Sequence, residues 1–183
     1  MQTLHRLQSS PDTTLVTSVA ALMHRLLPKD TWTHATLQLE RNGTVERDTL
    51  LAKLLRLGYR RVSVVEIPGE FSIRGGLIDL FAMGSVLPYR IDLFGDDIES
   101  IKAFDVDTQR TLYPVPEIRL LPAREFPLDD AGRTRFRGRY RETFEGDPSK
   151  SKLYKDVSNG LAPAGIEYYL PLFFDETATL FDY

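Results

Sequence analysis

FSIRGGLIDLFAMGSVLPYRIDLFGDDI, residues 71–98, is the stretch that decides the fold expected of this chain. It is rich in β-forming residues, and glycine interrupts it at Gly75-Gly76, Gly84 and Gly95. Glycine supplies the backbone conformations that tight turns need, so these interruptions separate short strands. Connections this short cannot hold crossover helices. The stretch therefore predicts a largely antiparallel sheet.

The predicted sheet extends beyond this stretch and is joined by one helix. Residues 34–40 alternate apolar and polar side chains as a strand does, and the turn dipeptide Asn42-Gly43 follows. Apolar residues then recur with helical spacing from Glu46 to Leu57, before Gly58. The β-type runs after the helix are Arg61–Glu66, Phe71–Arg74, Leu77–Phe81, Tyr89–Phe94 and Ile98–Phe104. One helix packed on a meandering sheet makes this part an α+β module.

The residues on either side of the module are typical of pieces of an α/β domain. Near the N-terminus, the apolar pair Leu15-Val16 predicts a buried strand and Val19–Met23 predicts a helix. That piece is too small to fold alone. The strands predicted over Thr111–Val115 and Glu117–Leu121 are bounded by prolines, which favour sheet edges and domain crossings, so a boundary is expected near residue 120.

The last third of the chain is predicted to be helical. Leu128-Asp129-Asp130 is typical of a helix start, and this helix is expected to reach about Phe144. A second helix is predicted over Lys152–Ser158, before an apolar and aromatic tail. The sequence therefore divides into residues 1–34, residues 35–120 and residues 121–183.

The composition is that of an ordinary globular protein. The 183 residues are 42% hydrophobic and include 23 basic and 26 acidic residues, for a formal charge of −3. This balance produces no global positive field of the kind that marks nucleic-acid-binding proteins, and it leaves room for a local basic patch. The chain has no cysteine and no apolar run near the roughly 20 residues that span a bilayer, so we expect a cytoplasmic protein without membrane contact.

Motifs for catalysis and cofactor binding are absent from the sequence. Neither G-x-x-x-x-G-K-[ST] nor G-x-G-x-x-G occurs, and histidine occurs only at positions 5, 24 and 34, outside the module. Six acidic residues cluster in sequence without the central glycine and distal glutamate of a calcium loop, so we interpret them as turn and strand-edge carboxylates. They are Asp92, Asp96, Asp97, Glu99, Asp105 and Asp107. The sequence predicts no catalytic residue, no cofactor and no metal site.

The predicted helix after residue 128 carries five arginines within nine residues and no acidic residue among them. These are Arg133, Arg135, Arg137, Arg139 and Arg141. Helical spacing divides the arginines into two stripes and aligns Phe136, Tyr140 and Phe144 as a buried seam. Two interpretations stay open. The arginines form a surface that contacts the phosphates of duplex DNA, or they form a solvated face that pairs with nearby carboxylates.

Strand alternation also predicts a sheet face that combines arginine with an exposed aromatic residue. In the run Tyr89–Phe94, the period of two sends Arg90, Asp92 and Phe94 to the face opposite the core. Arg74 takes the equivalent place in its own strand. An exposed aromatic residue flanked by arginines is typical of a protein-binding hot spot. The alternative is that a loop or domain covers Phe94 and that the arginines make exposed ion pairs worth about 0–1 kcal/mol each.

Several strings of the chain, in this order and spacing, resemble one known family. They are GYRRV at 58–62, EFSIRGGLIDLF at 70–81, LPYRIDLFGDDIESI at 87–101, LLPAREFP at 120–127 and AGIEYY at 164–169. Together they resemble the UvrB-like N-terminal module of the bacterial transcription-repair coupling factors. The resemblance covers nearly the whole chain.

The resemblance implies a fold, a partner and site residues. Residues 1–34 and 121–183 would belong to a degenerate, helicase-like α/β domain that has lost nucleotide binding, and residues 35–120 would be an inserted α+β domain that recruits the damage sensor UvrA. Matched position by position, the UvrA-contacting residues fall on Arg74, Arg90 and Phe94. The chain would then be a piece of a longer ATP-dependent DNA translocase that also engages RNA polymerase and double-stranded DNA.

Two functional hypotheses follow. The first is a non-enzymatic module that docks on UvrA in transcription-coupled nucleotide excision repair. The alternative is a DNA-binding fragment of a UvrB-type repair protein that uses the arginine-rich helix, and its affinity would fall steeply with salt. ATP hydrolysis by this chain is disfavoured because the phosphate-binding loop is absent.

Overall fold

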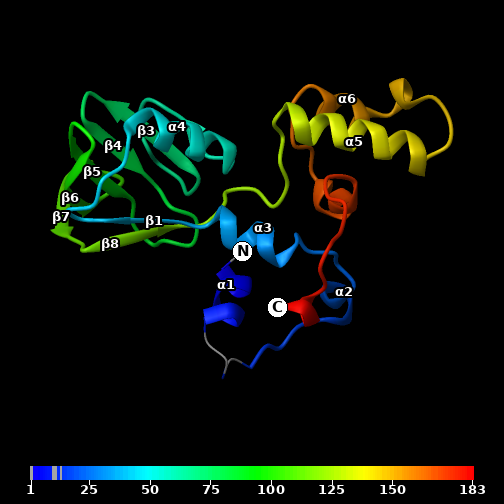
Figure 1. Cartoon of the computed structure of the whole chain (residues 1–183), viewed down its shortest axis with the longest axis horizontal. Coiled ribbons are helices and arrows are strands. Elements are labelled where there is room, and N and C mark those ends of the chain that lie inside the picture. Colours follow the sequence, from blue (N-terminus) through cyan, green and yellow to red (C-terminus); the bar gives the residue numbers. More distant parts are fainter. Residues whose placement is uncertain (1, 10–11, 13) are drawn as a thin grey trace. The chain divides into compact units, whose positions relative to one another are not determined.

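Residues 71–98 form the centre of an antiparallel sheet, as their sequence predicts. The computed structural model describes residues 2–9, 12 and 14–183, which separate into two units (Figure 1). Unit 1 contains Gln2 and residues 34–124, and unit 2 contains residues 3–33 and 125–183, so the first residue of helix α1 and the last two of helix α3 are counted with unit 1. The fold is mixed, with a six-stranded sheet and several helices.

Unit 1 is built from helix α4 and two sheets. Its elements are β1 (Leu37–Glu40), α4 (Arg47–Arg56), β2 (Arg60–Arg61), β3 (Glu70–Arg74), β4 (Leu77–Leu80), β5 (Tyr89–Phe94), β6 (Asp97–Phe104), β7 (Thr111–Pro114) and β8 (Glu117–Leu120). The larger sheet has the order β2-β3-β4-β5-β6-β7, and its neighbours are antiparallel except for β2 and β3. β1 and β8 pair separately. The largely antiparallel meander is confirmed.

The first β-type run of the module differs from its prediction. A strand was expected over Arg61–Glu66, but β2 ends at Arg61 and the chain then leaves the sheet. The backbone amides of Glu66 and Ile67 donate to the carboxylate of Glu70, at 2.9 and 3.1 Å, instead of pairing with a strand. A side chain therefore satisfies backbone groups that a strand ladder would otherwise have to satisfy.

Helix α4 forms where the apolar spacing predicts it, and it supplies one side of the unit 1 core. The Glu46 carboxylate caps the helix by accepting from the amides of Asp48 and Thr49. Leu50 and Leu54 are fully buried. They pack in one cluster with apolar side chains from the sheet, which include Phe71, Ile78, Leu80, Ile91 and Ile101. Burial of these side chains fixes which face of the sheet lies against α4.

Among the described residues of unit 1, side chains and loops cover one end of the opposite face of the sheet. Val65, Phe81 and Phe104 form a second, smaller apolar cluster, and Val62 and Val106 pack against it. Phe104 ends β6 and Phe81 directly follows β4, and the three valines come from the loops after β2 and β6. The loops therefore close one end of this face, and the end that carries Arg74 and Phe94 is exposed.

Unit 2 is mainly helical. Its elements are α1 (Gln2–Ser9), α2 (Val19–Leu22), α3 (Lys29–Ala35), α5 (Asp130–Thr143), α6 (Lys152–Ser158) and the 3-10 helices η1 (Pro148–Lys150), η2 (Ile166–Leu172) and η3 (Leu180–Asp182). The predicted helices at residues 128–144 and 152–158 are confirmed. The side chain of Phe136 on α5 is fully buried and lies 5.0 Å from the ring of Phe173 and 6.4 Å from that of Tyr154. Phe136 therefore joins α5, α6 and the tail, whereas the predicted buried seam is confirmed only in part, because Phe144 is 39% exposed.

One predicted element of unit 2 is wrong. Leu15-Val16 was expected to be a buried strand, but it lies in irregular backbone, and Val16 is 91% exposed. Two apolar residues bury too little surface to hold a strand without a partner. In the described part of unit 2, strand-like pairing is limited to a bridge between Leu26 and Ala178. None of the helices in the described ranges combines the length and apolar character that a bilayer crossing requires.

Two glycines of α5 predict opposite responses to the same substitution. A Cβ at Gly132 would stand against the backbone carbonyl of Pro127, whereas a Cβ at Gly138 would meet no atom within 4 Å. We expect Gly132→Ala to lower the free energy of unfolding of unit 2 by about 1.5 kcal/mol through overpacking. Gly138→Ala should raise it by about 0.5–1 kcal/mol, because alanine has the higher helix propensity.

Native-state hydrogen exchange at the α5 amides measures both effects and separates unit 2 from unit 1. Equal responses of the two alanine variants would contradict the packing described for Gly132.

Candidate protein-binding site

The three residues singled out by strand alternation lie on the sheet face opposite α4. Arg74 ends β3, and Arg90 and Phe94 lie on β5. Phe94 is 74% exposed, so the alternative in which a loop covers it is not what the structure shows. β4 lies between the two strands and brings the arginines to a common carboxylate.

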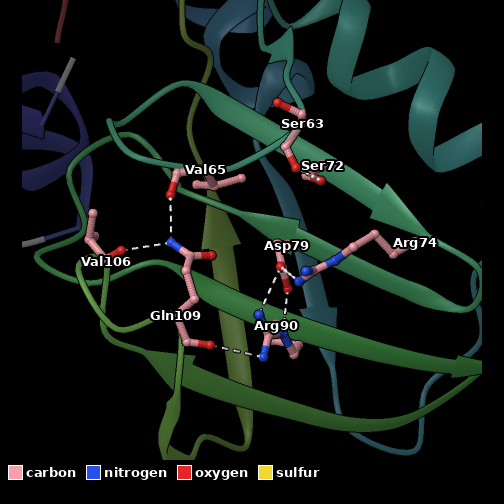
Figure 2. Close-up of polar contacts among 8 residues, drawn as sticks. All are labelled: Ser63, Val65, Ser72, Arg74, Asp79, Arg90, Val106 and Gln109. Atoms are coloured by element: carbon pink, nitrogen blue, oxygen red, sulfur yellow. Dashed lines mark hydrogen bonds and ion pairs between the residues drawn. The ribbon is translucent and has the colours of Figure 1, made fainter.

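That carboxylate belongs to Asp79, at the centre of β4. Cross-strand pairing places Ser72, Asp79 and Arg90 in one row, so their side chains share a face. Arg90 donates to both oxygens of Asp79, from Nε to Oδ1 at 2.6 Å and from Nη2 to Oδ2 at 2.9 Å. Arg74 also donates from its Nη2 to Oδ2. Figure 2 shows the carboxylate lying between the two guanidinium groups.

Arg90 makes two further contacts besides its hydrogen bonds to Asp79. Its Nη1 donates to the backbone carbonyl of Gln109 at 3.3 Å, and its guanidinium lies 5.0 Å from the ring centroid of Phe104. The hydrogen bonds to Asp79 raise the pKa of Arg90 above its usual value, against the opposing effect of burial. Only 18% of the Arg90 side chain is exposed, whereas 53% of the Arg74 side chain is.

Gln109 forms hydrogen bonds with both loops that cover the sheet face near Arg90 (Figure 2). Its side-chain amide donates to the carbonyls of Val65 and Val106, at 3.2 and 2.7 Å. Its backbone adopts a φ of 58°, in the left-handed region that non-glycine residues rarely enter. This conformation lets one residue bind both loops through its side chain and Arg90 through its carbonyl.

Sequence reasoning missed Asp79 and Glu70 as buried members of this module. Asp79 is 2% exposed and Glu70 is 5% exposed. The signal for Asp79 was present, since a lone carboxylate interrupts the apolar strand Leu77–Phe81. Burial raises the pKa of Glu70, but hydrogen bonds from the Glu66 amide and from Arg60 outweigh it, and the net pKa lies below its usual value.

Four of the six acidic residues of the sequence cluster lie in turns, loops or at a strand end, whereas Asp92 and Glu99 lie within β5 and β6. Asp96 and Asp97 lie at the turn between β5 and β6 and are exposed. Asp105 accepts from the amide and hydroxyl of Thr108, at 2.8 and 2.7 Å, and these hydrogen bonds lower its pKa. Among the residues whose placement is described, no group of three or more histidine, aspartate and glutamate side chains is arranged to hold a metal ion.

The five arginines of α5 lie along one helix, and several have partners within unit 2. Arg133 pairs with Asp130, and Arg135 lies 3.6 Å from Asp175. The guanidinium of Arg141 lies 5.6 Å from the ring centroid of Tyr154.

The remaining two arginines, Arg137 and Arg139, differ in their contacts. Arg139 donates to Asp175 at 2.8 Å and to the carbonyls of Pro171 and Phe174. Arg137 donates to the Thr134 hydroxyl at 3.0 Å. The contacts of Arg139 with the tail therefore give it a structural role in unit 2, whereas the contact of Arg137 lies within α5.

The contacts of Arg139 predict a loss of stability when it is removed. Arg139→Ala leaves the carbonyls of Pro171 and Phe174 without their donor, and we expect the free energy of unfolding of unit 2 to fall by about 1.5–2 kcal/mol. Arg137→Ala removes a contact to one hydroxyl and should change it by less than about 0.5 kcal/mol. Hydrogen exchange at the α5 amides measures both, and equal effects would contradict the structural role of Arg139.

Comparison with known proteins agrees with the resemblance. The family described as the UvrB interaction domain matches residues 37–126. Over the whole chain, the sequence is 44% identical to the transcription-repair-coupling factor of Haemophilus influenzae, of which it spans 16%. It is 45% identical to that of Escherichia coli over 96% of the chain and 15% of the relative. The Bacillus subtilis factor is 29% identical over the whole chain and 17% of the relative. The chain therefore belongs to the transcription-repair-coupling factor family, and residues 37–126 form its UvrB interaction domain.

Proposed function

We propose that unit 1 docks on UvrA through the face formed by Arg74, Arg90 and Phe94, and so recruits the excision machinery in transcription-coupled repair. The observation that carries this proposal is Phe94, an aromatic side chain 74% exposed at the open end of a sheet face. An exposed aromatic residue flanked by arginines is typical of a protein-binding hot spot.

The arginines beside Phe94 support a protein partner. Asp79 holds Arg74 and Arg90 in fixed positions, so little side-chain entropy remains to be lost when a partner binds. Arginine and aromatic residues are enriched in the energetically important parts of protein interfaces, where the aromatic residue fills a pocket and arginine satisfies acceptors. The name of the matched family contains the repair protein UvrB, and the resemblance supplies UvrA as the partner.

The arginine-rich helix supports the DNA-binding alternative less well. Arg133, Arg135 and Arg139 pair with carboxylates of unit 2, so phosphates would have to compete with existing partners. The chain spans 15–17% of the three coupling factors named above. ATP-dependent translocation and contacts with RNA polymerase and double-stranded DNA are accordingly proposals for a whole coupling factor.

A titration of the chain with its cognate UvrA tests the proposed function. We expect a saturable one-site complex, measured by isothermal titration calorimetry or biolayer interferometry, with a negative heat-capacity change from the burial of apolar surface. A parallel titration with duplex DNA at low salt should show weak binding. No complex with UvrA, with the fold verified by circular dichroism, would rule out the proposal.

A further inference from the structure

The carboxylate of Asp79 is buried beneath the proposed docking face of unit 1. Its side chain is 3% exposed, and both of its oxygens accept hydrogen bonds from arginine. An ionised carboxylate is retained in such a place only when it is paired and hydrogen-bonded. Asp79 therefore depends on the arginines, and the arginines depend on Asp79 for their positions.

The charges of this cluster do not balance. One carboxylate faces two guanidinium groups, which leaves one positive charge in excess. Arg90 donates through three of its nitrogens, to Asp79 and to Gln109, and stacks over Phe104. Arg74 donates to Asp79 through one nitrogen, and its side chain, which has five N–H donors, is half exposed. The excess charge is therefore presented by Arg74.

The two arginines consequently have different parts in recognition. Arg90 is mostly buried and fixes Asp79, and Asp79 fixes the guanidinium of Arg74 at the open end of the face, where Phe94 is also exposed. A fixed guanidinium with free N–H donors binds a planar carboxylate in a fork geometry that lysine cannot reproduce. The matching group on the partner is therefore an acidic side chain.

We propose that Asp79 is a positioning residue that orients Arg74 toward a carboxylate of the partner protein. This inference rests on the proposed docking on UvrA, and it adds a residue and a partner chemistry to that face. Asp79 itself does not contact the partner, because it is covered by the two arginines.

The test compares Asp79→Asn with Glu70→Gln, a matched control in the same sheet. Glu70 is also a buried carboxylate paired with a mostly exposed arginine, Arg60, but it anchors the loop after β2. Both substitutions neutralise a buried carboxylate without changing its size. We expect Asp79→Asn to weaken UvrA binding by about tenfold or more, a typical effect of disturbing an interfacial charge pair, and Glu70→Gln to change it by less than about twofold.

A double-mutant cycle with Arg74→Ala separates positioning from general destabilisation. In the wild-type background, Arg74→Ala should weaken UvrA binding by about tenfold, and in the Asp79→Asn background by less than about twofold, because Arg74 is already misplaced. All variants are measured at a temperature where circular dichroism shows them folded. An unchanged affinity of folded Asp79→Asn, or an equal loss in Glu70→Gln, would overturn the inference while leaving the docking proposal intact.

A second readout does not depend on UvrA. The Nε–H group of Arg90 donates to Asp79 at 2.6 Å, so its proton should exchange slowly with water in NMR spectra. We expect this protection to be lost in Asp79→Asn and kept in Glu70→Gln. If the wild-type chain shows the protection but does not bind UvrA, the docking proposal fails while the positioning geometry stands. If the wild-type chain shows no protection, the positioning inference fails by itself.

Discussion

Phe94→Ala should weaken the complex with UvrA by about thirtyfold or more, which corresponds to the roughly 2 kcal/mol typical of an aromatic hot-spot residue. Phe94 is 74% exposed in the chain alone, so the apolar area of its ring is available to be buried by a partner. The same exposure means that the ring contributes little to the fold. The free energy of unfolding should change by less than about 0.5 kcal/mol.

Tyr113→Ala is the matched control for this experiment. Tyr113 is another exposed aromatic residue of unit 1, 52% exposed on β7. It pairs with Ala103, which pairs with Tyr89, so it belongs to the face of the sheet that carries the core and not to the face of Phe94. Its removal should leave UvrA affinity unchanged. Equal losses in the two variants, or none in Phe94→Ala, would show that the docking surface lies elsewhere.

The face itself could be predicted from the sequence because it depends on local rules. Alternation within Tyr89–Phe94 separates Arg90 and Phe94 from the core, and short turns force neighbouring strands to pair. Helical spacing likewise located α4, and helix start and stop signals located α5 and α6. The assignment of Arg74, Arg90 and Phe94 to UvrA binding came from the resemblance and stays a prediction.

The parts that sequence reasoning missed depend on contacts between distant residues. Asp79 meets Arg90 across 11 positions, and Gln109 reaches Val65 across 44. No periodicity within one segment indicates that two loops close over one end of the face, or that the side chain of Arg90 is mostly buried. The pairing of β1 with β8 is another contact of this kind, since it joins the two ends of the module.

Arg90→Ala should lower the free energy of unfolding of unit 1 by about 3 kcal/mol, at the lower end of the range for breaking a buried ion pair. The Asp79 carboxylate, 3% exposed, would keep Arg74 as its single arginine partner in the described structure. The carbonyl of Gln109 would lose its donor, and the ring of Phe104 would lose the guanidinium stacked on it. The retained pair with Arg74 is the reason for expecting a loss at the low end of that range.

Arg74→Ala is the control against which the loss of stability in Arg90→Ala is compared. Arg74 is more exposed, and its removal leaves the bidentate pair between Arg90 and Asp79 intact, so unit 1 should lose less than about 1 kcal/mol. Native-state hydrogen exchange at the amides of β4 and β5 reports on unit 1 alone. A stability loss in Arg90→Ala no larger than that in Arg74→Ala would contradict the division between an arginine that holds the face and one that presents it. Because Arg90 holds the face, the UvrA affinity of Arg90→Ala has to be measured at a temperature where unit 1 is still folded. Because Arg74 contributes little to the fold, a loss of UvrA affinity in Arg74→Ala reports on recognition directly.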